Sequence, residues 1–178
     1  MSSDGQWLIM REYRPNGSRD IFARRWTGDT TERTVIATPA EDVSPTLSPD
    51  GKWIAYGSDD GGMRDVWVSP FPDPQGAKWQ ISTGGGYEPL WSRDGKEIFY
   101  ITPDNVMTAV EVNTAAGFSI GKRRALFGVD AYRRHFTHRA YDVMPDGRFV
   151  LIRDGHPLAG DLVMVDNWTS ELAARLRK

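Results

Sequence analysis

The chain has 178 residues, 39% of them hydrophobic and 26% charged, which is typical of a folded domain rather than a disordered one. Its 22 Lys and Arg against 24 Asp and Glu give a formal net charge of −2, without the basic excess of a sequence-independent nucleic-acid binder. No cysteine is present, so disulfides and thiolate sites are excluded, and no apolar run approaches the ~18 residues of a membrane-spanning helix.

Asp-Gly pairs recur along the chain and divide it into four similar units. They are Asp4-Gly5, Asp50-Gly51, Asp94-Gly95 and Asp146-Gly147, each followed by an apolar run. The aspartates are 46, 44 and 52 residues apart, which is the length of a four-stranded blade rather than of a helical repeat. The spacing therefore predicts an all-β fold, a β-propeller segment of about four blades.

The second and third units show the expected strands most fully. The second unit predicts strands at residues 44–48, 52–57, 64–69 and 78–82, and the third at 87–92, 97–102, 106–112 and, more weakly, 125–127. The predicted blades are residues 3–39, 43–83, 87–128 and 140–168 of a single domain spanning 1–178.

The second strand of each unit is apolar without alternation. These runs are residues 7–10, 53–56, 98–101 and 149–152. A strand covered on one side would alternate polar and apolar positions, whereas the middle strands of stacked blades are covered on both sides. Stacked blades explain these runs better than an open sandwich does.

Both ends of the repeat lack a strand. The first unit has strands at residues 6–12, 20–25 and 34–38 but none before Asp4, so its innermost strand is missing. The last has strands at 140–144, 148–153 and 161–165 but no outermost one, and the tail, 169–178, holds a predicted short helix at 170–177. We expect the last four units of a longer ring, with a self-closed four-bladed ring as the alternative.

At residues 48–56 (SPDGKWIAY) and 65–68 (DVWV), the chain resembles the TolB-like propellers. The resemblance extends over nearly the whole chain. Residues 78–86, 93–100 and 167–169 are further similar to the C-terminal propeller of bacterial serine/threonine protein kinases and related regulators. The resemblance implies a non-catalytic sensor or scaffold module that binds a protein or small ligand, without a cofactor. An extracytoplasmic location agrees with it, although residues 1–8 do not form a signal peptide and the sequence fixes no compartment.

A basic and aromatic stretch lengthens the last spacing. It comprises the candidate binding residues Tyr132, Arg133, Arg134, His135, His138 and Arg139. Loops on a rigid scaffold often carry binding residues, and paired guanidinium groups suit a carboxylate or phosphate. Replacing Arg133 and Arg134 with Ala is then expected to weaken binding of an anionic partner. The alternative is a solvated connection whose aromatic side chains pack on the next blade.

Polar residues also enter the innermost strands. Tyr87 and Glu88 occupy positions equivalent to Asp42–Ser44, and we expect them at the mouth of the central channel, where they bind a ligand or hydrogen-bond neighbouring blades.

Other motifs favour structural interpretations. Residues 117–121 (GFSIG) match the nucleophile elbow of serine hydrolases at Ser119, but no strand-to-helix context is expected there. Residues 84–86 (GGG) read as an inter-blade linker, and Asp59, Asp60 and Asp65 lack the spacing of a calcium loop. His135 and His138 have no evident third ligand, so no metal site is predicted.

Two other functions remain open. The chain is alternatively the propeller of a prolyl-oligopeptidase-like serine hydrolase whose catalytic domain lies elsewhere. A free-standing assembly protein would instead self-associate through its open blade edges.

Overall fold

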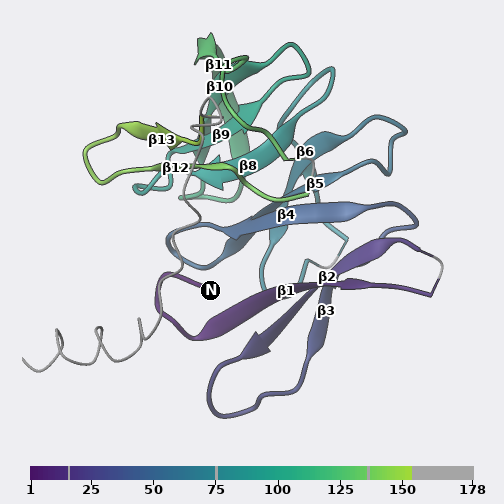
Figure 1. Cartoon of the computed structure of the whole chain (residues 1–178). Helices are drawn as coiled ribbons and strands as arrows, with labels where there is room; N and C mark the ends of the chain where they lie inside the picture. Colours follow the sequence, from purple (N-terminus) through teal and green to yellow (C-terminus); the bar gives the residue numbers. More distant parts are fainter. Residues whose placement is uncertain (16, 75, 136, 154–178) are drawn as a thin grey trace, which may run out of the picture.

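The computed structural model describes residues 1–15, 17–74, 76–135 and 137–153. Within them the chain forms only β-strands, which assemble into four antiparallel sheets that follow one another in chain order (Figure 1). The predicted all-β class is therefore confirmed. The predicted strand at 161–165 and helix at 170–177 lie outside the described residues.

The first two sheets show what the first unit lacks. The first sheet contains β1 (Trp7–Tyr13), β2 (Arg19–Arg25) and β3 (Arg33–Ile36), and the second contains β4 (Asp42–Leu47), β5 (Trp53–Ser58), β6 (Asp65–Pro70) and β7 (Trp79–Gln80). β1 and β5 both follow an Asp-Gly turn, so β1 is the second strand of its unit. Within the described residues, no strand pairs with β1 on the side where β4 pairs with β5.

The third sheet is complete and the fourth is partly described. The third contains β8 (Tyr87–Trp91), β9 (Glu97–Ile101), β10 (Val106–Asn113) and β11 (Ser119–Gly128), and the fourth contains β12 (Tyr141–Val143) and β13 (Phe149–Leu151). β11 is far longer than the weak strand predicted at 125–127. It is the outermost strand, so its mostly exposed side chains include a charged run, residues 122–124, that conceals the strand in the sequence.

Three of the four Asp-Gly turns share one hydrogen-bond pattern that involves a preceding serine. In the third unit, Ser92 Oγ donates to Asp94 Oδ1 at 2.8 Å and accepts the Glu97 N–H at 2.9 Å. Ser2 and Ser48 make the equivalent bonds in the first two units. Gly95 has a φ of 71°, a left-handed conformation that favours glycine at this position. The serine ties each turn to the strand that follows it.

Three hydrophobic clusters lie between successive sheets and hold them together. In β5, Ile54 and Tyr56 pack toward the first sheet, where they meet Trp7 and Ile21. Ala55, between them in sequence, packs toward Ile98 of the third sheet. Both faces of the strand are therefore buried, which accounts for its unbroken apolar run.

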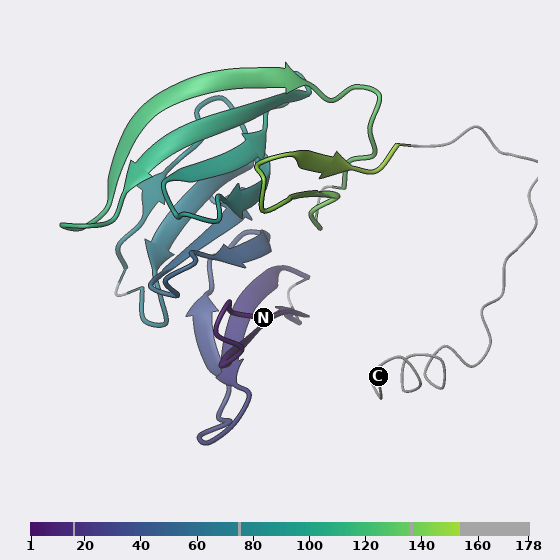
Figure 2. The same ribbon diagram turned by 90° about the vertical axis from the view of Figure 1, so that its left-hand side faces the viewer.

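The sheets fan out around a common axis (Figure 2). The ends of β4, β8 and β12 converge on an opening of about 370 Å³ beside the Asp-Gly turns, lined by residues such as Leu47, Leu90 and Val143. The beginning of β4 faces a second opening at the other end of the axis, and the loop between β11 and β12 reaches that opening.

Candidate functional site

Glu88 anchors the loop that precedes β12. Its side chain is buried, and its carboxylate accepts the N–H of His135 at 3.1 Å and that of Ala140 at 2.6 Å. Its backbone carbonyl accepts the Tyr141 hydroxyl at 2.8 Å. The residue has a φ of 56°, so its backbone is left-handed although it is not glycine. Burial raises the pKa of Glu88, while the two N–H bonds oppose that shift. The contacts fit the inter-blade interpretation of Glu88.

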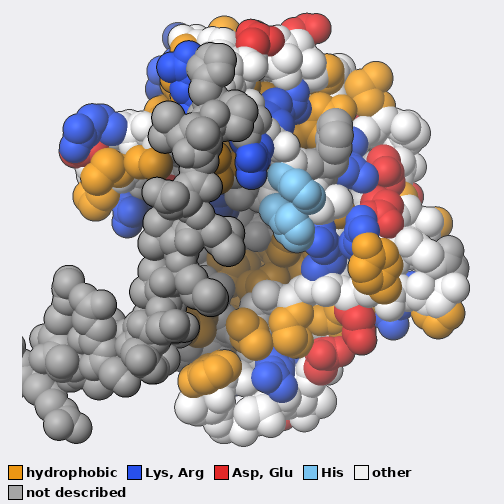
Figure 3. Space-filling view, in the orientation of Figure 1, with side chains coloured by type: hydrophobic (Ala, Val, Ile, Leu, Met, Phe, Trp, Pro, Cys, Tyr) orange, Lys and Arg blue, Asp and Glu red, His pale blue; other side chains and the backbone are white. Residues whose placement is uncertain are grey.

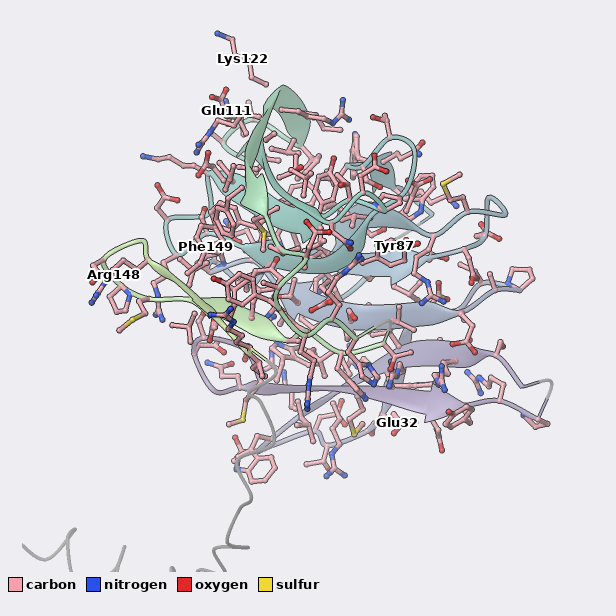
Figure 4. All side chains as sticks on the ribbon, turned by 45° about the horizontal axis from the view of Figure 1, so that its top comes forward. Glu32, Tyr87, Glu111, Lys122, Arg148 and Phe149 are labelled. Atoms are coloured by element: carbon pink, nitrogen blue, oxygen red, sulfur yellow. The ribbon has the colours of Figure 1, made fainter. Side chains whose placement is uncertain are left out.

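Tyr87 and Arg134 form a second contact between the third sheet and this loop. The Arg134 guanidinium lies 5.0 Å from the centre of the Tyr87 ring and donates to the Asn105 side chain. Asn105 in turn donates to Asp130 at 2.8 Å. Figure 4 places Tyr87 near the middle of the molecule, whereas Lys122 and Arg148 project at its margins. Arg134 is thus half-buried and packed rather than free to meet a partner.

The start of the loop runs beside the end of β13. Tyr132 forms an isolated antiparallel bridge with Arg153, and the Arg133 N–H donates to the Ile152 carbonyl at 2.7 Å. Both side chains are exposed. The backbone of Tyr132 and Arg133 therefore lies against the end of the fourth sheet.

The second half of the loop borders an opening that we call the basic mouth, defined by Arg11, His138 and Arg139. His135 and His138 stack with their ring centres 4.5 Å apart, and Figure 3 shows them with Lys and Arg side chains beside them. Arg11, on β1, donates to the Thr137 carbonyl at 2.7 Å and so joins the first sheet to the loop. The Arg139 guanidinium donates to the Tyr141 carbonyl at 3.0 Å.

A cavity of about 430 Å³ lies within the basic mouth. Its lining consists of Ile9, Met10, Arg11, Ser44, Pro45, Thr137, His138 and Arg139. No carboxylate is among these residues, and in the described ranges neither arginine forms an ion pair. Three basic groups over an apolar floor give the cavity the character of an anion site.

Ser44 is the least satisfied polar group of this cavity. It is 9% exposed, and its hydroxyl is buried without a hydrogen-bond partner among the described residues. Asp42, two residues earlier, differs, since its carboxylate accepts the Thr38 N–H at 3.0 Å. Of the residues 42–44, which the sequence aligned with Tyr87 and Glu88, Ser44 lines the cavity, whereas Asp42 makes local hydrogen bonds.

The pKa of the His138 imidazole is lowered, which favours its neutral form. Partial desolvation, with the charges of Arg11 and His135 adding to it, lowers the pKa of the His138 imidazole. A neutral ring leaves the basic mouth with the two permanent charges of Arg11 and Arg139 near neutral pH. Protonation in acid adds a third, so the affinity of the mouth for anions should rise as pH falls.

The remaining motifs make structural contacts. Ser119 begins β11 and pairs with Asn113, so a strand and not a helix follows it. Asp59 and Asp60 pair with Arg64 and Lys78, respectively. The part of the chain that the structure describes holds neither a cluster of three or more His, Asp or Glu suited to a metal nor a helix long and apolar enough to cross a membrane.

Sequence reasoning missed Arg11. Its hydrogen-bond partner is a backbone carbonyl 126 residues away, which leaves no local signal.

Comparisons with solved structures identify the fold. A structure assigned as TolB from Agrobacterium tumefaciens is 18% identical, with a TM-score of 0.62 over 88% of this chain. A puromycin-hydrolysing peptidase from Mycobacterium tuberculosis is 19% identical, with a TM-score of 0.60 over 85%. The β-propeller domain of the Trilobed protease from Pyrococcus furiosus is 14% identical, with a TM-score of 0.50 over 68%.

The fold is that of a β-propeller. The chain spans only 57% of the Agrobacterium protein, 27% of the peptidase and 40% of the protease domain. No protein-family model and no curated protein matches the sequence. These neighbours include both TolB and peptidases, so they show the propeller fold alone, do not test a kinase-associated role and leave catalytic status open.

Proposed function

We propose that this propeller segment is a non-catalytic module that binds an anionic protein or small ligand at the basic mouth. The cavity beside Arg11, His138 and Arg139 supports it most, because basic groups converge there and no carboxylate lines the cavity. Glu41, whose charge acts on Arg11, is paired with Arg19. Glu88 and Arg134 keep the loop in place from the opposite side. The proposal moves the binding role from Arg133 and Arg134 to Arg11 and Arg139.

The alternative function, a propeller that accompanies a serine hydrolase, rests on the likeness to the peptidase fold. In that case a catalytic domain would belong to the same full-length protein. The complete reading frame distinguishes the two: a hydrolase domain favours the alternative, and a kinase or other regulatory domain favours a sensor.

Binding of fluorescein-labelled hexaglutamate, followed by anisotropy, tests the binding proposal. We expect Arg139→Gln to weaken binding about two- to fivefold, the range for an exposed ion pair. Arg24→Gln is the matched control, because Arg24 is exposed on β2 outside the cavity and its loss changes the net charge equally. Added salt should weaken binding to the wild type. Equal affinities in the two variants would contradict the proposed site.

A further inference from the structure

The outermost strand of the third sheet, β11, has an unusually long edge. The outermost strands of the first two sheets, β3 and β7, have four and two residues, whereas β11 has ten and curves along the outside of the molecule (Figure 2). Proteins commonly keep such edges short, because unpaired N–H and C=O groups pair readily with another chain. The third sheet already has four strands, as the second has, and in the part of the chain that the structure describes no strand pairs with the outer side of β11.

The backbone of β11 presents hydrogen-bonding groups along this edge. On β10, the Val112 N–H donates to the carbonyl of Lys96, which directly precedes β9. The even-numbered residues of β10 therefore face β9, and the odd-numbered ones face β11. Arg123 and Ala125 both pair with even-numbered residues of β10. Their own N–H and C=O groups consequently point outward, away from β10.

Register shifts limit the regular part of this edge to a short stretch. The pairing of β10 with β11 shifts on both sides of residues 123–125. Bulges and charged side chains protect an edge from indiscriminate pairing. Between the two shifts the edge keeps the alternation that strand pairing needs. It thus offers one short site of defined position instead of a ten-residue template.

Basic side chains lie on both faces of the sheet at this stretch. The Arg123 guanidinium donates to the Ile81 carbonyl at 3.0 Å, on the side of the second sheet. Successive side chains of a strand alternate, so Arg124 lies on the other face, where it pairs with Glu97 at 2.6 Å. Lys122 projects at the margin of the molecule (Figure 4) and forms no ion pair among the described residues.

Acidic residues near this stretch lie behind β11. Glu97 is on β9 and Glu111 is on β10, so both are on the inner side of the edge. A strand added on the outer side meets the basic side chains of β11 first. Its residues opposite Arg123 and Arg124 would meet one positive charge on each face of the sheet.

We propose that the edge of β11 at residues 123–125 is an interaction surface that takes an extended acidic segment of a partner protein as a fifth strand. Main-chain hydrogen bonds to Arg123 and Ala125 supply affinity, and acidic side chains opposite Arg123 and Arg124 select the partner. A second copy of the chain fits less well, because two paired β11 strands would bring like charges opposite each other. No residue of β11 lines the cavity of the basic mouth, so this surface is independent of the proposed function.

A short strand-forming peptide tests the charge preference. The peptide TVEEVT, blocked at both ends and labelled with fluorescein, presents one carboxylate to each face and is rich in β-branched residues. We expect it to bind, and we expect TVQQVT to bind about three- to tenfold more weakly, because two exposed cross-strand charge pairs are lost. Equal affinities of the two peptides would overturn the acidic partner.

Ala125→Pro tests the strand pairing. Proline removes an N–H that points outward, while the N–H that pairs β11 with β10 at this point belongs to Arg124 and remains. Binding of TVEEVT should fall tenfold or more, with the midpoint of urea unfolding nearly unchanged. The control, Ala125→Thr, keeps the N–H and should bind like the wild type. Equal affinities of the two variants would rule out strand addition.

N-methylated peptides give the same answer with the unaltered protein. The N–H groups of adjacent residues in a strand point to opposite sides, whatever the register. Methylating the nitrogen of one glutamate of TVEEVT should therefore weaken binding tenfold or more, and methylating the other should leave it nearly unchanged. Similar effects at both positions would overturn the inference even if Ala125→Pro disturbed the sheet.

The hexaglutamate experiment separates this inference from the proposed function. If hexaglutamate binds at Arg139 and TVEEVT does not bind, the edge proposal is wrong and the binding proposal stands; if only TVEEVT binds, the reverse holds. If Arg139→Gln weakens TVEEVT binding as well, the peptide lies in the basic mouth and the edge proposal is wrong. A dimer in light scattering that Ala125→Pro dissociates would also overturn it, because a second copy would then cover the edge.

Discussion

Replacing Glu88 with Ala should loosen the loop that carries the basic mouth. The change removes the acceptor for the N–H groups of His135 and Ala140. A buried N–H left without a partner costs about 1–3 kcal/mol, but both loop residues are partly open to water. Relief from burying the carboxylate offsets part of the loss, so we expect the free energy of unfolding to fall by about 1–3 kcal/mol in total.

Urea unfolding followed by tryptophan fluorescence measures this change, and hydrogen exchange at His135 and Ala140 locates it. Glu32→Ala is the control, because Glu32 is exposed and projects from the first sheet (Figure 4). Glu88→Gly should lose about 1 kcal/mol less than Glu88→Ala, since glycine accepts a φ of 56° without strain. A loss below about 0.5 kcal/mol, with unchanged exchange, would refute the anchoring role.

Three other predictions follow from pKa shifts and from backbone geometry. Because burial raises the pKa of Glu88, the part of the stability that is linked to its protonation is fully present below the ordinary pKa of a glutamate and is lost as pH rises through the raised value. Glu88→Gln should flatten this part of the urea-stability profile, and an unchanged profile would contradict the shift. The pKa of His138, measured by NMR, should lie below its ordinary value and rise in Arg11→Gln; no rise would exclude Arg11 as a cause. Gly85→Ala should cost several kcal/mol of unfolding free energy, because its Cβ would lie 2.6 Å from Pro103 at a φ of 100°. Gly84→Ala would place its Cβ within 4 Å of no other atom and should cost only about 1–2 kcal/mol. Equal losses in the two variants would rule out the clash.

The sequence was enough to predict the repeating sheets. Local chemistry determines an Asp-Gly turn, and the two-sided burial of β5 is written into the apolar run at 53–56. The serine in three of the turns had a visible signal as well, since Ser2, Ser48 and Ser92 each stand two residues before the aspartate. These features are readable because each depends on residues close in sequence.

The candidate site was only partly predictable. The sequence drew attention to the loop that borders the basic mouth, yet it grouped Arg134 with His138, although Arg134 packs on Tyr87 and His138 lines the cavity. Which basic side chains stay available depends on partners such as Glu88, whose bond to Ala140 spans 52 residues. Composition also concealed β11, because an outermost strand tolerates charge on its exposed side.

Chemical-shift mapping of the ¹⁵N-labelled chain with hexaglutamate tests the central claim, that the basic mouth is the binding site, most directly. The account predicts the largest shifts at Arg11, Ser44 and residues 137–139, all from elements around one cavity. Shifts centred instead on the opening beside the Asp-Gly turns, at Leu47 and Arg93, would contradict it, as would the absence of any localised shift.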